Sequence, residues 1–197
     1  MSAAVSRQGE HGPRPDVDHS LDELFGAMSV GVDTRVACTA DRAWAVVSDI
    51  SRIGEFSPEC AEAWWVDSDA ADQVGARFEG KNRVDGPQGV HEWIRLCEIT
   101  VWEPPRLISW TVGNRFDGTP ATEWSFAVEP AEGPGVVIRQ RFRHRADGLS
   151  GLREAAQKTP ENAAELIAKR SARLREGMSQ TLARMRSLLE SAPPAAS

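Results

Sequence analysis

The longest regular pattern in the sequence lies near the end of the chain, over residues 160–190, and predicts a long helix. Small and apolar residues recur there every three or four positions, which lays one stripe along a helix. The stripe consists of Ile167, Ser171, Leu174, Met178, Leu182, Met185 and Leu189. Thr159 followed by Pro160 is typical of a helix start, because a hydroxyl caps free N–H groups and proline has no N–H to leave unpaired. A helix this long needs an equally long partner to cover its stripe.

The middle of the chain changes from helical spacing to alternation of apolar and polar residues, which predicts β-strands. Turn signals rich in Gly, Pro, Asn and Asp separate the successive segments. The predicted strands cover residues 30–38, 61–66, 75–84, 90–102, 106–112, 122–130 and 136–144. The short connections between the later strands predict an antiparallel meander.

Two short helices are expected between the first and the second strand. One follows Thr39 and covers residues 42–48, and the other runs through Ile50 and Phe56 until Pro58 stops it. The order predicts an α+β fold, in which a curved antiparallel sheet of about seven strands wraps around the long C-terminal helix. No other predicted element is long enough to cover the apolar face of that sheet.

The two ends of the chain are poor in apolar residues. Residues 1–29 are predicted to be a mostly mobile tail with at most one short helical turn, formed by Leu21, Leu24, Phe25 and Met28. Residues 191–197 are expected to be a disordered tail, and residues 146–158 a linker. Residues 30–190 are then a single domain, which suits a chain of 197 residues.

Composition excludes several classes of function. A net charge of −6 argues against a protein whose main partner is nucleic acid. There is no membrane-length apolar run and the N-terminal residues do not resemble a signal peptide, so a cytoplasmic protein is expected. The three cysteines form no C-x-x-C pair, and no phosphate-binding loop, dinucleotide fingerprint or metal triad occurs. We therefore expect neither a cofactor nor a metal; the sequence does not predict the oligomeric state.

Alternation along the strands assigns one face of the sheet to the interior. This face combines aromatic, amide and charged side chains, and the chain has seven Trp but no Tyr. Flat aromatic walls with a few polar groups are typical of a ligand cavity. The candidate ligand-binding residues on the strands are Trp65, Phe78, Asn82, Trp93, Cys97, Trp110, Trp124, Phe126, Gln140 and Phe142, and those on the helix are Ile167, Ser171, Leu174 and Met178. Asn82 and Gln140 contact either a ligand or a neighbouring group or buried water.

Several motifs resemble the SRPBCC superfamily (START/Bet v 1-like), and in particular its bacterial polyketide cyclase/dehydrase-like members. They are the segment Ile-Ser-Arg-Ile-Gly-Glu-Phe-Ser-Pro-Glu-Cys at residues 50–60, Gly75-Ala76-Arg77-Phe78 with Gly80 and Asn82, then Trp93, Cys97 and Glu103-Pro104, and Leu174-Arg175-Glu176-Gly177-Met178 with Thr181-Leu182. The resemblance implies a helix-grip fold over residues 30–190, in which the sheet grips the long helix around a deep apolar pocket.

The resemblance also implies a function. Residues 30–190 would bind a hydrophobic, aromatic or polyketide-like small molecule in an internal cavity. One hypothesis adds catalysis, a cyclisation or dehydration (lyase) step of bacterial secondary metabolism driven by positioning and proton transfer. The alternative is a non-catalytic protein that binds or transports a lipid or hydrophobic metabolite. A weaker hypothesis is a protein-interaction module that uses the outer face or the long helix.

Three residues are the candidates for catalysis, Glu59, Arg95 and His144. An inward Arg95 requires a carboxylate, for which Glu59 is a candidate, or a bound anion; otherwise it reaches solvent at the rim or a bulge turns it away. Glu59 either abstracts a proton or satisfies backbone groups beside Pro58, the role we favour for Ser57. His144, at a strand end, is either a general acid or base or a solvated histidine.

The outward-facing arginines of the last strand could bind phosphate. Arg139, Arg141 and Arg143 alternate there with inward residues, while several glutamates share their face by the same alternation. Cross-strand charge pairing explains this row better than a phosphate site does.

Overall fold

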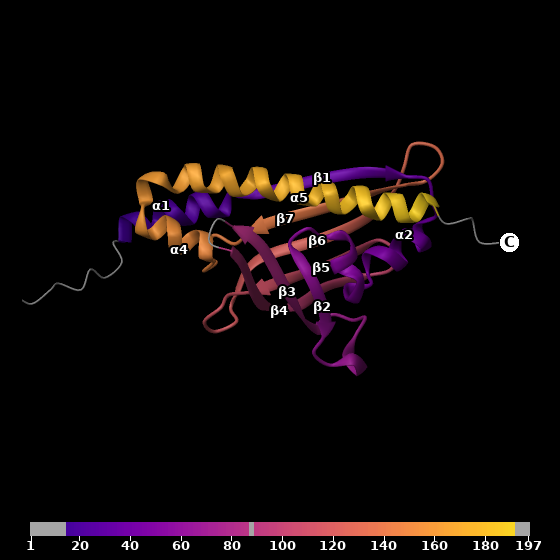
Figure 1. The fold of residues 1–197 in the computed structure, drawn as a ribbon, viewed down its shortest axis with the longest axis horizontal. Coiled ribbons are helices and arrows are strands. Elements are labelled where there is room, and N and C mark those ends of the chain that lie inside the picture. The colour runs from indigo at the N-terminus through magenta and orange to yellow at the C-terminus, as the bar shows by residue number, and fades with distance from the viewer. Residues whose placement is uncertain (1–14, 87–88, 192–197) are drawn as a thin grey trace, which may run out of the picture.

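The computed structural model describes residues 15–86 and 89–191, with side chains from Ser20 onward. One seven-stranded antiparallel sheet forms its centre, in the order β1-β7-β6-β5-β4-β3-β2 (Figure 1). The strands are β1 Ser29–Val36, β2 Cys60–Trp65, β3 Arg77–Gly86, β4 Gly89–Glu103, β5 Leu107–Gly113, β6 Pro120–Pro130 and β7 Val136–His144. Each predicted strand is present with small shifts at its ends, and the first strand lies at the edge beside the last.

Helices cover the inner face of the sheet. They are α1 Pro15–Gly26, α2 Ala40–Val47, α3 Ile53–Phe56, α4 Gly151–Lys158 and α5 Ala163–Ser191, with short 3₁₀ turns η1 Ile50–Arg52, η2 Ser68–Ala70 and η3 Pro160–Asn162. Thr39 caps α2 by accepting a hydrogen bond from the Arg42 N–H (3.4 Å), as its position before the helix predicted. The α+β helix-grip class is therefore confirmed. No helix in the described part of the chain is both long and apolar enough to cross a membrane.

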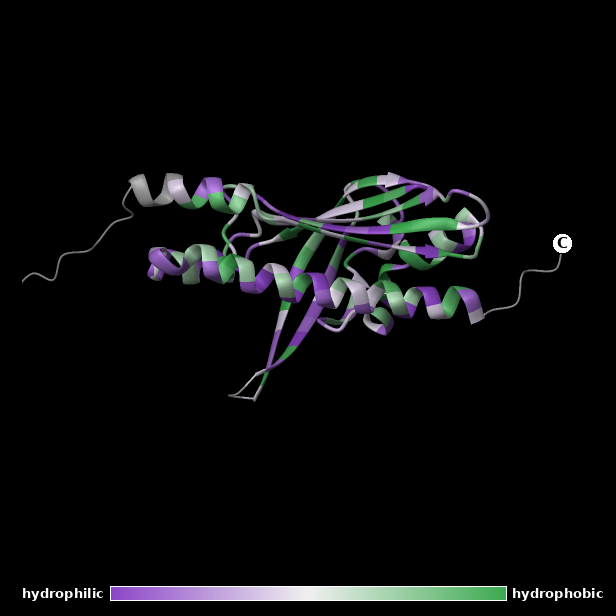
Figure 2. Cartoon of the chain, turned by 90° about the horizontal axis from the view of Figure 1, so that it is seen from above, coloured by the Kyte–Doolittle hydropathy of each residue, from purple (hydrophilic) through white to green (hydrophobic). Residues whose placement is uncertain are grey.

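The long helix α5 spans 29 residues, about 43 Å, and lies along β1 at one edge of the sheet (Figure 1). In Figure 2 green and purple residues alternate along α5, and the far part of the β3–β4 hairpin emerges on the opposite side of the helix from β1. The sheet thus curls around the helix. Because α5 lies close to β1, it covers the inner face of β3 and β4 less closely.

Two hydrophobic clusters divide the stripe of α5 between them. The sheet cluster contains Leu182, Met185 and Leu189 together with Phe56 and residues of β3–β7, among them Ile108 and Phe126. The α1 cluster contains Leu174 and Met178 together with Phe25, Met28 and Phe142. Val32 and Trp124 pack against both clusters, so the boundary between the two runs beneath the middle of α5.

A bulge in β4 changes which side chains face inward. The pairing with β5 shifts between Ile99 and Val101, so that Ile99 opposes Trp110 and Trp102 opposes Ile108. Both Ile99 and Trp102 therefore reach the inner side, and Trp102 packs edge-on against Trp44 of α2 with ring centroids 5.3 Å apart. Trp102 thereby joins α2 to the sheet cluster.

The N-terminal prediction differs from the structure from residue 15 onward. Instead of a mobile tail the chain forms α1, which buries Leu21, Phe25 and Met28 and leaves Leu24 37% exposed. The buried residues lie four and three positions apart, so they share one face of a helix. The sequence did not predict α1 because this spacing involves only three apolar residues in an otherwise polar segment. Residues 1–14, and residues 192–197 of the predicted C-terminal tail, lie outside the described part.

The predicted linker 146–158 contains α4, which the sequence analysis missed. Ser150 caps this helix by accepting a hydrogen bond from the Arg153 N–H (3.1 Å). Arg153 is only 5% exposed, and its guanidinium pairs with Asp22 of α1 and donates to the Ala146 carbonyl. Arg153 therefore ties α4 to α1.

Replacement of Phe25 by Ala should lower the free energy of unfolding by about 3–4 kcal/mol, because it empties a fully buried ring position between α1, β7 and α5. Leu24→Ala, one residue away on the exposed face, should cost less than about 1 kcal/mol. Urea unfolding followed by tryptophan fluorescence measures both values. Equal losses for the two variants would show that α1 does not pack as described.

Candidate functional site

Aromatic rings form a continuous wall across the inner face of the sheet. Trp65 lies 5.7 Å from Phe78, Phe78 lies 6.0 Å from Trp110, and Trp110 lies 5.9 Å from Phe126, measured between ring centroids. The rings are tilted or edge-on, which suits their quadrupoles. Phe78, Trp110 and Phe126 are buried, so this wall belongs to the core of the protein.

The predicted ligand-binding residues fall into two groups. The fully buried ones are Phe78, Cys97, Trp110, Phe126, Gln140, Phe142, Leu174 and Met178. The half-buried ones are Trp65, Asn82, Trp93, Trp124, Ile167 and Ser171. The half-buried members lie mainly on β3, β4 and β6 and on the N-terminal half of α5, as expected where the helix stands away from the sheet. A ligand could reach this second group without displacing the core.

The expected deep cavity between the sheet and α5 is not among the hollows that stand out on the described residues. One hollow, of about 520 Å³, lies beside β2 and is lined by Gly54, Ala63 and Trp64. Another, of about 300 Å³, lies between Arg35 and Glu190. Alternation shows which face a side chain occupies, but it does not show how far the opposite wall extends. Here the large rings and the two clusters fill much of the space that the sequence analysis interpreted as hollow.

Arg95 faces inward from β4, opposite Gly80 of β3, and is half-buried. Its guanidinium donates to the Ile94 carbonyl (2.7 Å), and within the described residues it has no carboxylate partner. Burial lowers the pKa of Arg95; the positive charge of Arg115 adds to this effect and the negative charge of Glu154 opposes it. Arg95 is thus a partly desolvated guanidinium without a carboxylate partner in the described part of the chain.

Glu59 is paired with Arg170 of α5 and not with Arg95, the partner suggested by the sequence. Two guanidinium nitrogens of Arg170 donate to its two oxygens at 2.7 and 2.8 Å. Arg170 was not among the predicted site residues, because nothing in its spacing distinguishes it from the other charged residues of the helix. Ser57 has the structural role that we favoured: its hydroxyl accepts from the N–H groups of Glu59 (3.2 Å) and Cys60 (2.9 Å).

His144 is buried at 2% exposure, which differs from a solvated strand-end histidine. Its Nδ1 lies 2.7 Å from the Arg145 carbonyl, which can only accept, so Nδ1 carries a hydrogen. Its Nε2 lies 2.8 Å from the Ser150 hydroxyl and accepts from it in the neutral ring. The ring also packs on Phe25, with centroids 4.5 Å apart. Both nitrogens are therefore occupied; Nε2 joins β7 to the cap of α4, and the ring packs β7 against α1.

Two buried oxygens have no hydrogen-bond partner among the described residues. One is Oε1 of Gln140, on the inner face of β7 at the boundary of the two clusters. The other is Oε1 of Glu154, whose Oε2 accepts from Arg115 at 2.6 Å. Asn82, in contrast, donates to the Gly80 carbonyl at 3.3 Å. An unpaired buried oxygen is costly, so each of the two requires a donor from water or from a ligand.

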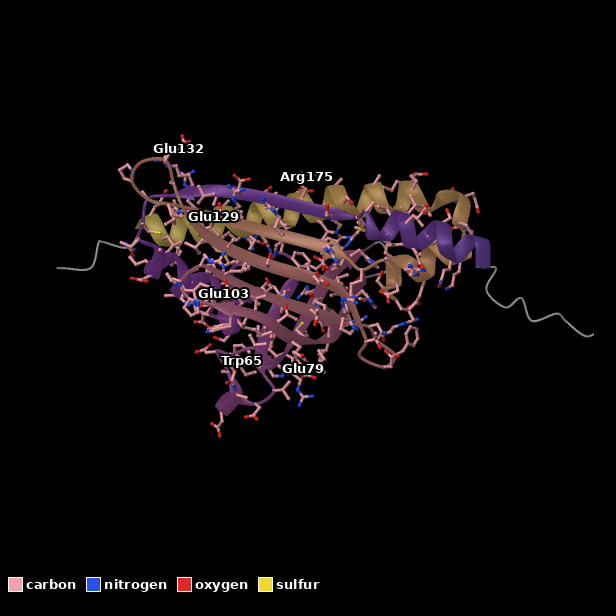
Figure 3. The ribbon with its side chains drawn as sticks, turned by 180° about the vertical axis from the view of Figure 1, so that it is seen from behind. Trp65, Glu79, Glu103, Glu129, Glu132 and Arg175 are labelled. Carbon is pink, nitrogen blue, oxygen red and sulfur yellow. The ribbon has the colours of Figure 1, made fainter. Side chains whose placement is uncertain are left out.

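Acidic and basic side chains pair on the outer face of the sheet, as the alternation predicted. Figure 3 views the protein from behind, where Glu129 projects from β6. Arg139 lies 2.9 Å from Glu129, and Arg143 lies 3.7 Å from Glu123. Arg141 instead lies across Gly31, where a side chain would clash with it, and donates to the Val32 carbonyl at 3.2 Å. This row is therefore a poor candidate for a phosphate site.

The cysteines are not activated. Burial raises the pKa of Cys60 to about 11 and also raises the pKa of Cys97. Both thiols therefore stay protonated near neutral pH and are poor nucleophiles. In the part of the chain that the structure describes, no group of three or more His, Cys, Asp and Glu side chains is placed to hold a metal ion.

A sheet curled around a C-terminal helix, with an aromatic and partly accessible inner face, defines a helix-grip protein of the type that holds small apolar molecules. The chain belongs to the family described as polyketide cyclase/dehydrase and lipid transport, which matches residues 27–190. The resemblance carried by the sequence motifs is thereby confirmed. A search of curated proteins gave no match.

Solved structures share this fold. The Polyketide_cyc-like protein Cgl2372 from Corynebacterium glutamicum is 32% identical, with a TM-score of 0.58 over 83% of this chain and 91% of that one. Protein Ms6760 from Mycobacterium smegmatis is 19% identical, with a TM-score of 0.53 over 84% and 92% of the two chains. The di-domain ARO/CYC BexL from the BE-7585A biosynthetic pathway is 14% identical, with a TM-score of 0.59 over 84% of this chain and 50% of BexL. The last two show similarity of fold alone.

The buried position of His144 predicts a pH dependence of stability. Burial lowers the pKa of His144 below its ordinary value of 6.5, with the nearby charge of Arg153 acting in the same direction. The unfolded chain therefore binds the proton first as the pH falls. The contribution of His144 is complete above about pH 6.5 and is lost below it by up to about 1.4 kcal/mol per pH unit.

His144→Gln should be about 1–2 kcal/mol less stable than the parent at pH 7.5, because two buried hydrogen bonds change. The difference in unfolding free energy should decrease between pH 6.5 and 5.5, because only the parent loses stability when its unfolded state binds a proton that the folded state does not. Urea unfolding at these pH values measures it, with His91→Gln on the exposed part of β4 as the control. A difference that stays constant with pH would contradict the buried neutral ring.

Proposed function

We propose that this protein binds a hydrophobic, aromatic or polyketide-like small molecule between the inner face of the sheet and the N-terminal half of α5. The observation that carries the proposal is a difference in burial between two parts of the inner face. The side chains beneath Leu182 and Met185 are fully buried, whereas Trp93, Arg95 and Trp124 are only half-buried. Aromatic and polar side chains left partly uncovered on a concave apolar face provide both contact area and orientation for a ligand.

Membership of the family supports this proposal at the level of class, since its description names both cyclase/dehydrase activity and lipid transport. BexL and StfQ, which share this fold, are di-domain ARO/CYC proteins from the BE-7585A and steffimycin biosynthetic pathways. At this low identity the two structures support the fold, whereas the ligand of this chain depends on its own residues.

Binding without catalysis is favoured by the state of two candidate acid–base groups. Glu59 is held by both nitrogens of Arg170, and His144 has both ring nitrogens occupied. Proton transfer by either residue would first require those hydrogen bonds to break. Arg95 alone is free to act on a ligand, so the catalytic alternative depends on positioning and charge stabilisation at that residue.

The direct experiment is native mass spectrometry of the full chain purified from its own host. A co-purifying apolar molecule of defined mass supports the proposal, and its structure identifies the chemistry. Repeated purification without any bound molecule, together with no binding of added naphthalene-type probes, would count against it.

Ser171→Phe should weaken binding of the neutral fluorescent probe N-phenyl-1-naphthylamine by about tenfold or more, because the ring would occupy the uncovered space beside α5. Its melting temperature should stay close to that of the parent, since Ser171 is half-buried and outside both clusters. Ala172→Phe, on the exposed face of the same helix turn, is the matched control. Equal binding by the two variants would show that the ligand lies elsewhere; an equally large loss of stability in Ser171→Phe would indicate a solid interior.

A further inference from the structure

Three charged residues from three elements meet at the end of the inner face that is nearest α4. They are Arg95 of β4, Arg115 of the loop between β5 and β6, and Glu154 in the first turn of α4. Arg115 and Glu154 form an ion pair at 2.6 Å. Arg95 precedes Cys97 of β4 by two residues, and Arg115 follows Val112, the β5 partner of Cys97, by three, so the strand register brings both arginines to the same end of the sheet. This group, the α4 charge cluster, carries one net positive charge.

The α4 charge cluster has unused hydrogen-bonding capacity of both kinds. Within the described residues, the guanidinium of Arg95 spends one nitrogen on the Ile94 carbonyl and pairs with no carboxylate. Glu154 spends Oε2 on Arg115 and leaves Oε1 buried without a donor. The cluster thus offers N–H donors at Arg95 and a carboxylate acceptor at Glu154, at the same end of the inner face and both partly buried.

The charge balance decides which ligand fits. A partly buried guanidinium without a counter-ion is costly, and an anion that accepts two parallel hydrogen bonds relieves that cost best. A ligand carboxylate meets this requirement and brings the cluster to neutrality. The free oxygen of Glu154 would repel a bare carboxylate, however, unless the ligand also presents a donor to it, such as a hydroxyl beside the carboxylate.

The apolar surface next to the cluster indicates the chemistry of the remaining part of the ligand. The row of inner-face residues adjoining Arg95 runs through Cys97, Val112 and Thr122, and Trp124 follows one step along β6. Val112, Thr122 and Trp124 are half-buried. A flat apolar ring system can lie on these side chains while its polar end reaches the cluster.

We propose that the α4 charge cluster is the site for the polar end of the ligand, and that the ligand is an aromatic or polyketide-like hydroxy acid. Its carboxylate accepts hydrogen bonds from Arg95, and its neighbouring hydroxyl donates to Oε1 of Glu154. This inference rests on the proposed function, because the apolar body of the ligand must occupy the inner face.

The test compares three probes on the full chain by fluorescence titration at pH 7.5. They are 3-hydroxy-2-naphthoate, 2-naphthoate, which lacks the hydroxyl, and 2-naphthol, which lacks the carboxylate. The parent should bind 3-hydroxy-2-naphthoate about tenfold more tightly than 2-naphthol. Arg95→Met should abolish that difference while leaving the affinity for 2-naphthol unchanged, and Arg95→Gln, which keeps a polar group without the charge, should act in the same way.

Two further variants complete the test. Glu154→Ala should abolish the preference for 3-hydroxy-2-naphthoate over 2-naphthoate. Arg77→Met removes the same charge from the exposed outer face of β3 and should change none of the affinities. A parent that binds 2-naphthol as tightly as the hydroxy acid, or an Arg95→Met variant that weakens all probes equally, overturns the inference but leaves the apolar site intact. Failure of all three probes to bind the parent overturns the proposed function as well.

Discussion

The burial of one concave sheet face constrains everything else in this protein. A seven-stranded sheet has an apolar side too wide for a single helix, even one of 29 residues, because α5 lies along β1 at one edge. The chain solves this with shorter helices, so that α2 and α3 complete the cover at one end and α1 and α4 at the other. The polar and half-buried side chains gather on the part of β3 and β4 before the β4 bulge, which the described helices do not cover closely. The candidate binding region thus follows from incomplete coverage of the sheet.

The strands and the long helix could be predicted because their patterns are long and repeat. Alternation placed Phe78, Cys97 and Gln140 correctly on the inner face, and the structure buries all three. The helix α1 could not be predicted in the same way, because its three buried residues are spread through a polar segment. Its stability comes from contacts with Phe142 and Leu174, which are remote in sequence. Local pattern alone carries no information about such contacts.

The partners of charged residues were harder to predict than the face of the sheet on which a side chain lies. Glu59 was correctly placed at the corner after α3, but its partner is Arg170, a residue more than one hundred positions away. His144 was assigned to its strand end correctly, yet α1 and α4 bury it there, and neither helix was predicted. Each of these differences has the same origin. The chemical state of a side chain depends on the elements that cover it, and those elements were the least regular in sequence.

The boundary of the family match has a practical consequence for α1. The match begins at residue 27, whereas α1 ends at Gly26. A chain trimmed to the matched region would keep every strand and α5 but would lose Asp22, the acidic partner of buried Arg153, and the ring of Phe25 that covers His144. The apolar side chains Met28, Phe142 and Leu174 would then face water beside an uncompensated guanidinium. Such a chain would expose an apolar patch and aggregate, even though the region that matches the family is intact.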